Sequence, residues 1–224
     1  MTMLSSHRIL IGASGWQHNH WHEQFYPEDL PEDWQLAYYG NEFPVVLIRE
    51  QEWRQGEVEN WLDETDDLPL FVCELPLRDS DNVLLAAEPY LEKIRLLSKR
   101  CIGIVCQLAN TISADTLSAL LNNCNELAPS CVDMEGDIPE SLQAVLQTHS
   151  VNTVWKEASE TSNVTGALVL ANIHSDELDL KILRQLMDQL LSYDNKERTL
   201  VLIMSGEPPN LEMMKQAKVL LELL

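Results

Sequence analysis

The sequence of 224 residues is poor in basic side chains. Fifteen lysines and arginines stand against 36 aspartates and glutamates, and the formal net charge is −21. Binding to nucleic acid depends on Lys and Arg side chains that neutralise phosphates, and a strongly negative protein repels those phosphates. The densest basic stretch, Lys93–Arg100, has helical spacing and is interpreted as a solvated helix face. The composition therefore argues against nucleic acid as a partner.

Long apolar runs and paired cysteine motifs are also absent. No run approaches the roughly 18 residues of a membrane span, and the first residues lack the charged start and apolar stretch of a secretory signal. The five cysteines form no Cys-x-x-Cys pair, and most of them stand inside apolar runs, where cysteine behaves as a small hydrophobic residue. We therefore expect a cytoplasmic protein with reduced thiols and no membrane contact.

Motifs that assign an activity directly are missing as well. The chain has no Gly-rich phosphate loop, no Gly-x-Ser-x-Gly elbow and no zinc-finger spacing. Cys73 and Cys106 lie in apolar segments without an adjacent base, which disfavours a cysteine nucleophile. Function must therefore be argued from the fold and from the position of polar residues in it.

The chain does contain a regular alternation of apolar and amphipathic segments. Eight apolar runs have strand length, and several are continuous, as expected for strands that are covered on both faces. These runs are Arg8–Ala13, Pro44–Arg49, Pro69–Leu75, Cys101–Leu108, Cys131–Met134, Val151–Trp155, Ala167–Ala171 and Thr199–Met204. Stretches with helical spacing lie between them, with Ser113, Ser175 and Asn210 as expected N-caps.

This alternation predicts parallel strands joined by right-handed crossovers. Eight units favour a compact, single-domain (β/α)8 TIM-type barrel of the α/β class that spans residues 1–224. The sixth unit is expected to be short or irregular, because the segment from Lys156 to Gly166 is polar and has room for only a turn or two of helix.

A series of motifs follows the first predicted strand. They are Ala13-Ser14-Gly15-Trp16, Trp21, Phe25-Tyr26-Pro27, Leu30-Pro31 and Tyr38-Tyr39. The series resembles the opening of the YecE-like family, also called domain of unknown function 72. The similarity continues more loosely along most of the chain, where Gly103–Leu108 is similar to the family's Gly-x-x-x-Gln-Leu strand. The resemblance implies a TIM-type barrel, in agreement with the count of eight units.

The departures from the family pattern fall at the ends of predicted strands. Arg49 and Glu74 stand where the family commonly has Asn and Lys, and Asp133–Glu135 replaces Glu-Phe-Arg. His174 alone remains of an Arg-x-His-Gly segment, and Ser205–Glu207 replaces an Asn-Asn pair. In a TIM barrel such positions build the active site. We therefore interpret the chain as a divergent member whose site for an anionic ligand has been rebuilt or lost.

Three histidines of the first loop are candidate metal ligands. His18, His20 and His22 alternate, and imidazole suits zinc, iron or nickel. Side chains that alternate along an extended loop point to opposite sides, so convergence of all three requires a bend. The alternative is a polar loop between two anchoring tryptophans.

The acids at strand ends are candidate catalytic residues. Glu74, Asp133 and Glu135, with Glu207, could act as general acid and base, or could hold a divalent cation together with His174 and one histidine of the first loop. The alternative is that they are solvated residues at the entry to loops.

The remaining candidates are ligand-binding residues near the same end of the predicted barrel. They are Trp16, Trp21, Arg49, Gln107 and His174. The tryptophans either pack over the barrel end or stack on a ligand. Gln107 either binds a ligand or bonds to neighbouring strand ends, and Arg49 could instead form an ion pair with Glu50.

Two functional hypotheses follow. The first is a diverged, non-catalytic relative that binds a small molecule or another protein. The second is a metal-dependent hydrolase or lyase that uses the strand-end carboxylates and histidines with a divalent metal as cofactor. A nucleic-acid role has only fold analogy in its favour, and the acidic charge counts against it.

Overall fold

Eight parallel strands alternate with helices in the computed structural model, which describes residues 9–22, 24–65, 67–157 and 164–224. The strands are β1 Leu10–Ser14, β2 Val45–Ile48, β3 Leu70–Pro76, β4 Cys101–Leu108, β5 Ser130–Met134, β6 Asn152–Thr153, β7 Leu168–His174 and β8 Thr199–Ser205. Each predicted apolar run overlaps one of them, so the (β/α)8 TIM-type barrel is confirmed. Arg8, the first residue of the first predicted strand, lies outside the described residues.

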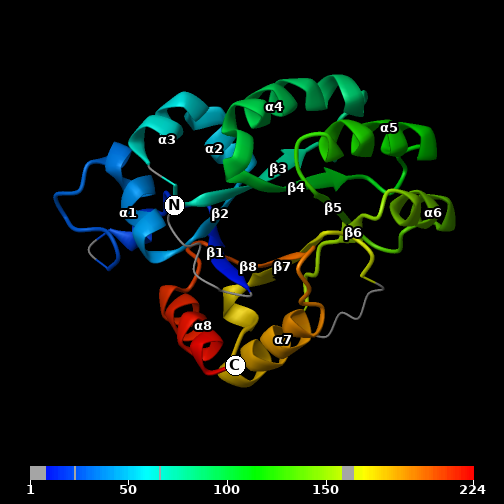
Figure 1. The fold of residues 1–224 in the computed structure, drawn as a ribbon. Coiled ribbons are helices and arrows are strands. Elements are labelled where there is room, and N and C mark those ends of the chain that lie inside the picture. Colours follow the sequence, from blue (N-terminus) through cyan, green and yellow to red (C-terminus); the bar gives the residue numbers. More distant parts are fainter. Residues whose placement is uncertain (1–8, 23, 66, 158–163) are drawn as a thin grey trace.

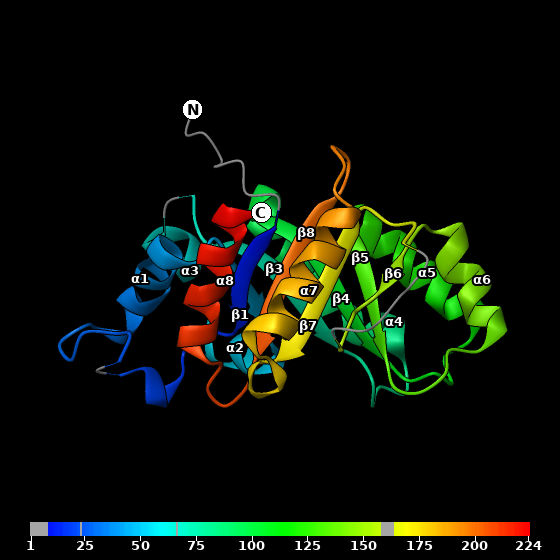
Figure 2. The same cartoon turned by 90° about the horizontal axis from the view of Figure 1, so that it is seen from below.

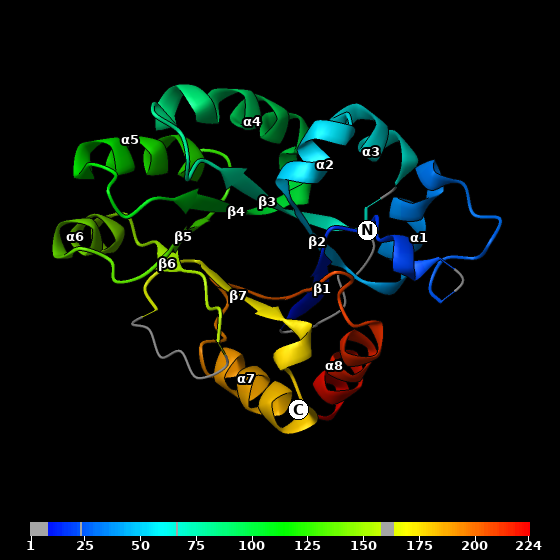
Figure 3. The ribbon, with the colours of Figure 1, turned by 180° about the vertical axis from the view of Figure 1, so that it is seen from behind.

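The helices form a ring around the sheet (Figure 1). They are α1 Gln35–Glu42, α2 Glu50–Gln55, α3 Val58–Glu64, α4 Val83–Leu97, α5 Ala114–Asn125, α6 Glu140–Thr148, α7 Leu180–Ser192 and α8 Leu211–Leu223. Helices α7 and α8 cover β7, β8 and β1, while α4 and α5 lie on the opposite side (Figure 3). The predicted N-caps Ser113 and Asn210 accept hydrogen bonds from Thr116 and Met213.

One predicted N-cap is wrong. Ser175 does not begin α7 but a short 3-10 helix, Ser175–Glu177, and the cap of α7 is Asp179, whose side chain accepts from the backbone N–H of Ile182. The Ser175 hydroxyl instead accepts from the backbone N–H of Asn210, at the start of α8. A contact between distant segments thus replaces the local cap.

The strand order β6-β5-β4-β3-β2-β1-β8-β7 makes a nearly closed barrel. Strand β6 has only two residues and pairs with β5 alone, which confirms an irregular sixth unit. Beyond its end, Trp155 bridges to β7: its N–H donates to the Leu170 carbonyl at 2.9 Å, and its carbonyl accepts from the Asn172 N–H at 2.8 Å. Most of the connection predicted between Lys156 and Gly166 lies outside the described residues, which resume at Val164.

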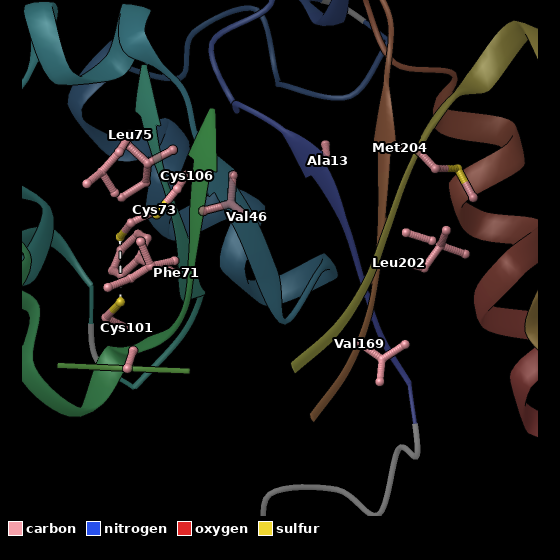
Figure 4. Packing of buried hydrophobic residues seen from close by; sticks show 14 of the residues in the cluster. Ala13, Val46, Phe71, Cys73, Leu75, Cys101, Cys106, Val169, Leu202 and Met204 are labelled. Atoms are coloured by element: carbon pink, nitrogen blue, oxygen red, sulfur yellow. Dashed lines mark hydrogen bonds between the residues drawn. The ribbon is translucent and has the colours of Figure 1, made fainter. Parts of the chain in front are cut away.

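Alternate residues of the strands point into the barrel. The apolar interior consists of Val45, Leu47, Val72, Val105, Cys131, Val154, Leu168, Leu170, Val201 and Ile203. Residues of the opposite parity, such as Val46, Phe71 and Leu202, point outward and pack in the layer beneath the helices (Figure 4). Side chains alternate between the two faces of the sheet along each strand. A polar residue that stands two positions beyond an inward-facing apolar residue therefore faces inward as well.

All eight strands run in the same direction, so their carboxyl ends meet at one end of the barrel. Figure 2 shows the loops that follow β1, β7 and β8 at this end. None of the helices in the described ranges combines the length and apolar character needed to cross a membrane.

Candidate functional site

A ring of polar residues occupies the end of the barrel at which the strands finish. Six of its members stand two positions beyond an inward-facing residue of the same strand, so that strand alternation turns them toward the barrel axis, while Arg49 and Lys156 lie beyond the ends of β2 and β6. The ring consists of Ser14, Arg49, Glu74, Gln107, Asp133, Lys156, Asn172 and Ser205, and we call it the barrel mouth. It lies where TIM barrels place their active sites.

Glu74, near the end of β3, is the most perturbed acid of the mouth. Only 9% of the residue is exposed. Burial raises the pKa of its carboxyl to about 7, the negative charge of Asp133 adds to the rise, and Arg49 and Arg78 oppose it. Among the residues that the structure describes, none makes a hydrogen bond or an ion pair with this carboxyl group. Glu74 is therefore a buried acid that titrates near neutral pH.

Asp133, on β5, has the opposite surroundings. The ammonium group of Lys156 lies 2.6 Å from its Oδ1, and the guanidinium of Arg78 lies 3.5 Å from the same atom. Arg78 also contacts Glu135 at 2.6 Å. Two cations thus pair with Asp133, whereas its neighbour Glu74 has no ion-pair partner in the described part of the chain.

Arg49 is held by two acids that come from different parts of the chain. Its guanidinium lies 2.7 Å from Oε1 of Glu52, a residue that is only 1% exposed, and 3.0 Å from Glu207. Gly15 has a φ of +76°, and a side chain there would collide with the Arg49 guanidinium. The ion pair that we considered between Arg49 and Glu50 does not form, because Glu50 pairs with Arg54.

The structure does not bring the three first-loop histidines together. His18 is buried, and its Nε2 donates to the Ser14 carbonyl at 3.0 Å. Burial, with the positive charge of Arg49, lowers the pKa of His18. His20 and His22 are exposed. Within the described ranges, no three His, Cys, Asp or Glu side chains are grouped so that they could hold a metal ion.

The two tryptophans are packing residues of the barrel end. Trp21 donates through Nε1 to the Pro209 carbonyl at 3.2 Å, and its ring lies parallel to that of Tyr39. Trp16 packs edge-on against Trp61, with ring centroids 5.4 Å apart. Both indoles are almost completely buried. Trp21 alone borders a surface groove, of about 430 Å³, whose other wall is the segment from Pro208 to Lys215.

The remaining predicted residues are divided between the mouth and its rim. Gln107 is half-buried and level with Asp133 on the neighbouring strand. Glu135 and His174 are exposed on the rim, where Glu135 pairs with Arg78 and His174 lies 3.8 Å from Asp176. A second groove, of about 360 Å³, runs between the loops after β3 and β4 and is lined in part by Arg78.

Several residues of the site did not emerge from the sequence. They are Glu52, Arg78, Lys156 and Asn172. Lys156 and Asn172 carry a signal, since each stands two positions beyond an apolar residue of a predicted strand, namely Val154 and Leu170. Arg78 comes from a loop and Glu52 from a helix, and no local pattern distinguishes either from a solvated charge.

Fold and site together define a (β/α)8 barrel with a polar mouth of mixed charge. Residues 10–224 match the family model described as "Protein of unknown function DUF72". The chain therefore belongs to the DUF72 family, as the motifs of its opening stretch predicted. No curated protein matches the sequence.

Proposed function

We propose that this protein binds a small polar ligand at the barrel mouth, as a diverged member of its family with a rebuilt site. The observation that carries this proposal is the buried Glu74 carboxyl group, which has no partner among the described residues. Groups of this kind cluster at functional sites, where a ligand supplies the missing partner.

The position of Glu74 favours a small molecule over a protein partner. Glu74 and Asp133 are each only 9% exposed, so a flat protein surface would not reach their carboxyl groups. Ligands of TIM barrels enter at this end and meet residues of several strands. Here strands β3, β4, β5 and β7 contribute Glu74, Gln107, Asp133 and Asn172.

Thermal unfolding in the presence of a chemically diverse panel of small polar metabolites tests this proposal. A ligand that binds the native state raises the unfolding temperature. The shift should be present in the wild type and in the control Glu59→Gln, which removes an exposed carboxylate on α3, and should be lost in Glu74→Gln. A panel without any hit, or a hit of equal size in Glu74→Gln, contradicts the proposal.

A second candidate function is acid–base catalysis by a hydrolase or lyase. The observation in its favour is the contrast between the two carboxyl groups, because burial raises the pKa of Glu74 to about 7 while Asp133 forms ion pairs with Lys156 and Arg78. Two neighbouring acids in such different environments are suited to separate acid and base roles. Catalysis predicts turnover that depends on the ionisation of Glu74 and is lost in Glu74→Gln.

The metal-dependent form of this enzyme has a test of its own. It requires a stoichiometric divalent ion after purification without chelators, measured by elemental analysis. Absence of the ion, together with no thermal shift from Mn²⁺, Zn²⁺ or Mg²⁺, would contradict it. The geometry supports the form without a metal better, since the described residues contain no group of three metal-ligating side chains.

We further propose that the protein works in a reducing compartment such as the cytoplasm. All five cysteines are buried and unpaired by disulfides, which is the state that a reducing environment maintains.

A further inference from the structure

Lys156 places an ammonium group in the barrel mouth, in contact with one of its acids. It follows Trp155, whose N–H donates to the Leu170 carbonyl and whose carbonyl accepts from the Asn172 N–H. These bonds hold the end of the sixth unit against β7, and the Lys156 side chain reaches Asp133 on β5, with 2.6 Å between Nζ and Oδ1. The lysine side chain is 44% exposed, so a molecule that enters the mouth can meet the amine.

Asp133 is placed to remove a proton from this ammonium group. The residue is only 9% exposed, and its carboxylate is in direct contact with Lys156. Arg78 lies 3.5 Å from the same oxygen, so the carboxylate keeps a second cation while Lys156 reacts. A lysine amine attacks carbonyl groups once an adjacent base has taken its proton. The pair of Lys156 and Asp133 is therefore suited to imine formation.

We propose that Lys156 forms an imine, or Schiff base, with a small neutral hydroxylated aldehyde or ketone, and that Asp133 transfers the protons. The inference rests on the proposed binding of a small polar ligand at the mouth and names the chemical class of that ligand. It also gives the lyase considered above a covalent intermediate, because a protonated imine withdraws electrons from the bonds of the neighbouring carbon atom.

The reaction balances without a further reactant. Asp133 accepts one proton from the Lys156 ammonium group, and the free amine attacks the carbonyl carbon while the carbon–oxygen π electrons move to oxygen. A second proton passes from nitrogen to this oxygen, which gives a carbinolamine. Asp133 then returns its proton to the hydroxyl group, which leaves as water while the nitrogen lone pair forms the C=N bond. The ammonium group and the carbonyl compound thus become a protonated imine and water.

The neighbours of Asp133 favour a neutral, hydroxylated substrate. Gln107 is its register partner on β4, and Glu74 on β3 is close enough for the charge of Asp133 to raise its pKa. A hydroxyl group both donates and accepts, so it can bond to an amide and to a carboxyl group in either ionisation state. A keto acid would instead bring a further negative charge to a mouth in which Arg78 and Lys156 are already paired with an acid.

Reductive trapping tests the inference. The protein is incubated at neutral pH with dihydroxyacetone and sodium cyanoborohydride, which reduces an imine to a stable secondary amine, and the modified lysine is identified by peptide mass spectrometry. Lys218, on α8, is an internal control, because its side chain is similarly exposed, at 39%, and pairs with an acid, Glu42, outside the mouth. Lys156 should be modified at least about a hundredfold faster than Lys218, which is a usual contribution of a positioned acid–base group. The rate at Lys156 should saturate with dihydroxyacetone, and no lasting mass increase should appear without the reductant.

Variants separate the roles of the two residues. Asp133→Asn should lower the rate of modification at Lys156 about a hundredfold or more, whereas Lys218→Arg should leave that rate unchanged. Lys156→Arg should lose the fast adduct and keep the slow labelling of other lysines. The comparison of Lys156 with Lys218 within the wild type needs no variant, so a failure of either mouth variant to fold leaves the test intact.

The outcomes distinguish this inference from the proposal on which it rests. If Lys156 reacts no faster than Lys218, its contact with Asp133 is a structural ion pair and the imine is refuted. Binding at the mouth still stands in that case if a metabolite from the panel stabilises the wild type but not Glu74→Gln. A fast Lys156 adduct with pyruvate and none with dihydroxyacetone refutes the neutral substrate. If the panel gives no ligand and Lys156 gives no fast adduct, both proposals fail.

Discussion

Replacement of Glu74 by glutamine should change how the stability of the protein depends on pH. Glutamine keeps the size of the side chain and removes its titration. Burial and the charge of Asp133 raise the pKa of Glu74 in the folded state from 4.5 to about 7. The folded protein therefore binds this proton more tightly than the unfolded chain does.

The sign follows from proton binding. Between pH 4.5 and about pH 7 the folded state holds more protons at Glu74 than the unfolded state, so the free energy of unfolding falls as the pH rises and becomes constant above pH 7. A tenfold change in a proton-binding constant is worth about 1.4 kcal/mol. The rise in pKa thus corresponds to about 3 kcal/mol of stability that the wild type loses across this range.

Urea denaturation of wild type and Glu74→Gln at several pH values between 4 and 8.5 measures the effect at constant ionic strength. The difference in unfolding free energy between the two proteins should move by about 3 kcal/mol in favour of Glu74→Gln as the pH rises from 4.5 to 7.5. The control Glu59→Gln should follow the wild type, because Glu59 is exposed. A constant difference between Glu74→Gln and wild type over the whole range would refute the reasoning.

Three further substitutions test the surroundings of the mouth. Arg49→Ala should lower the free energy of unfolding in chemical denaturation by about 3 kcal/mol or more, because it leaves the buried carboxylate of Glu52 unpaired. Adding Glu52→Gln to this variant should recover most of the lost stability. An unchanged loss in the double variant would count against a buried ion pair. Trp21→Ala should cost about 3–5 kcal/mol, while Trp21→Phe, which loses the bond to the Pro209 carbonyl and part of the buried ring, should cost less, about 1–3 kcal/mol. Equal costs would show that the hydrogen bond rather than the ring dominates. Asn172→Leu should leave the free energy of unfolding in urea unchanged or raise it by about 1 kcal/mol. The reason is that it removes a buried acceptor without a partner in the described part of the chain. A large loss of stability would indicate that Oδ1 has a structural donor.

The strands and several helix ends were predictable because they depend on local patterns. The run Cys101–Leu108 coincides with β4, and the caps at Ser113 and Asn210 form as expected. Ser175 was the exception, because its hydroxyl accepts from a residue 35 positions away. A cap is recognisable in sequence only when no distant group competes for the same side chain.

The candidate site was predictable in its place but not in its contacts. Glu74, Gln107 and Asp133 follow from their position at the ends of apolar strands, and the structure places them in the mouth. The three histidines are evenly spaced, yet only His18 is buried. Its ring donates a hydrogen bond to the Ser14 carbonyl and packs against the ring of Trp21. Equal spacing in a loop does not decide which side chain turns inward.

The amino-acid sequence by itself determined the alternation of strands and helices, the family and the end of the barrel at which polar residues gather, because each of these depends on residue order alone. Only the tertiary structure decided which charges meet. Arg49, Arg78 and Lys156 come from separate units of the barrel, and all three are engaged by acids other than Glu74. The pKa of Glu74 depends on burial and on charges from other segments, so its state near neutral pH is a property of the assembled barrel.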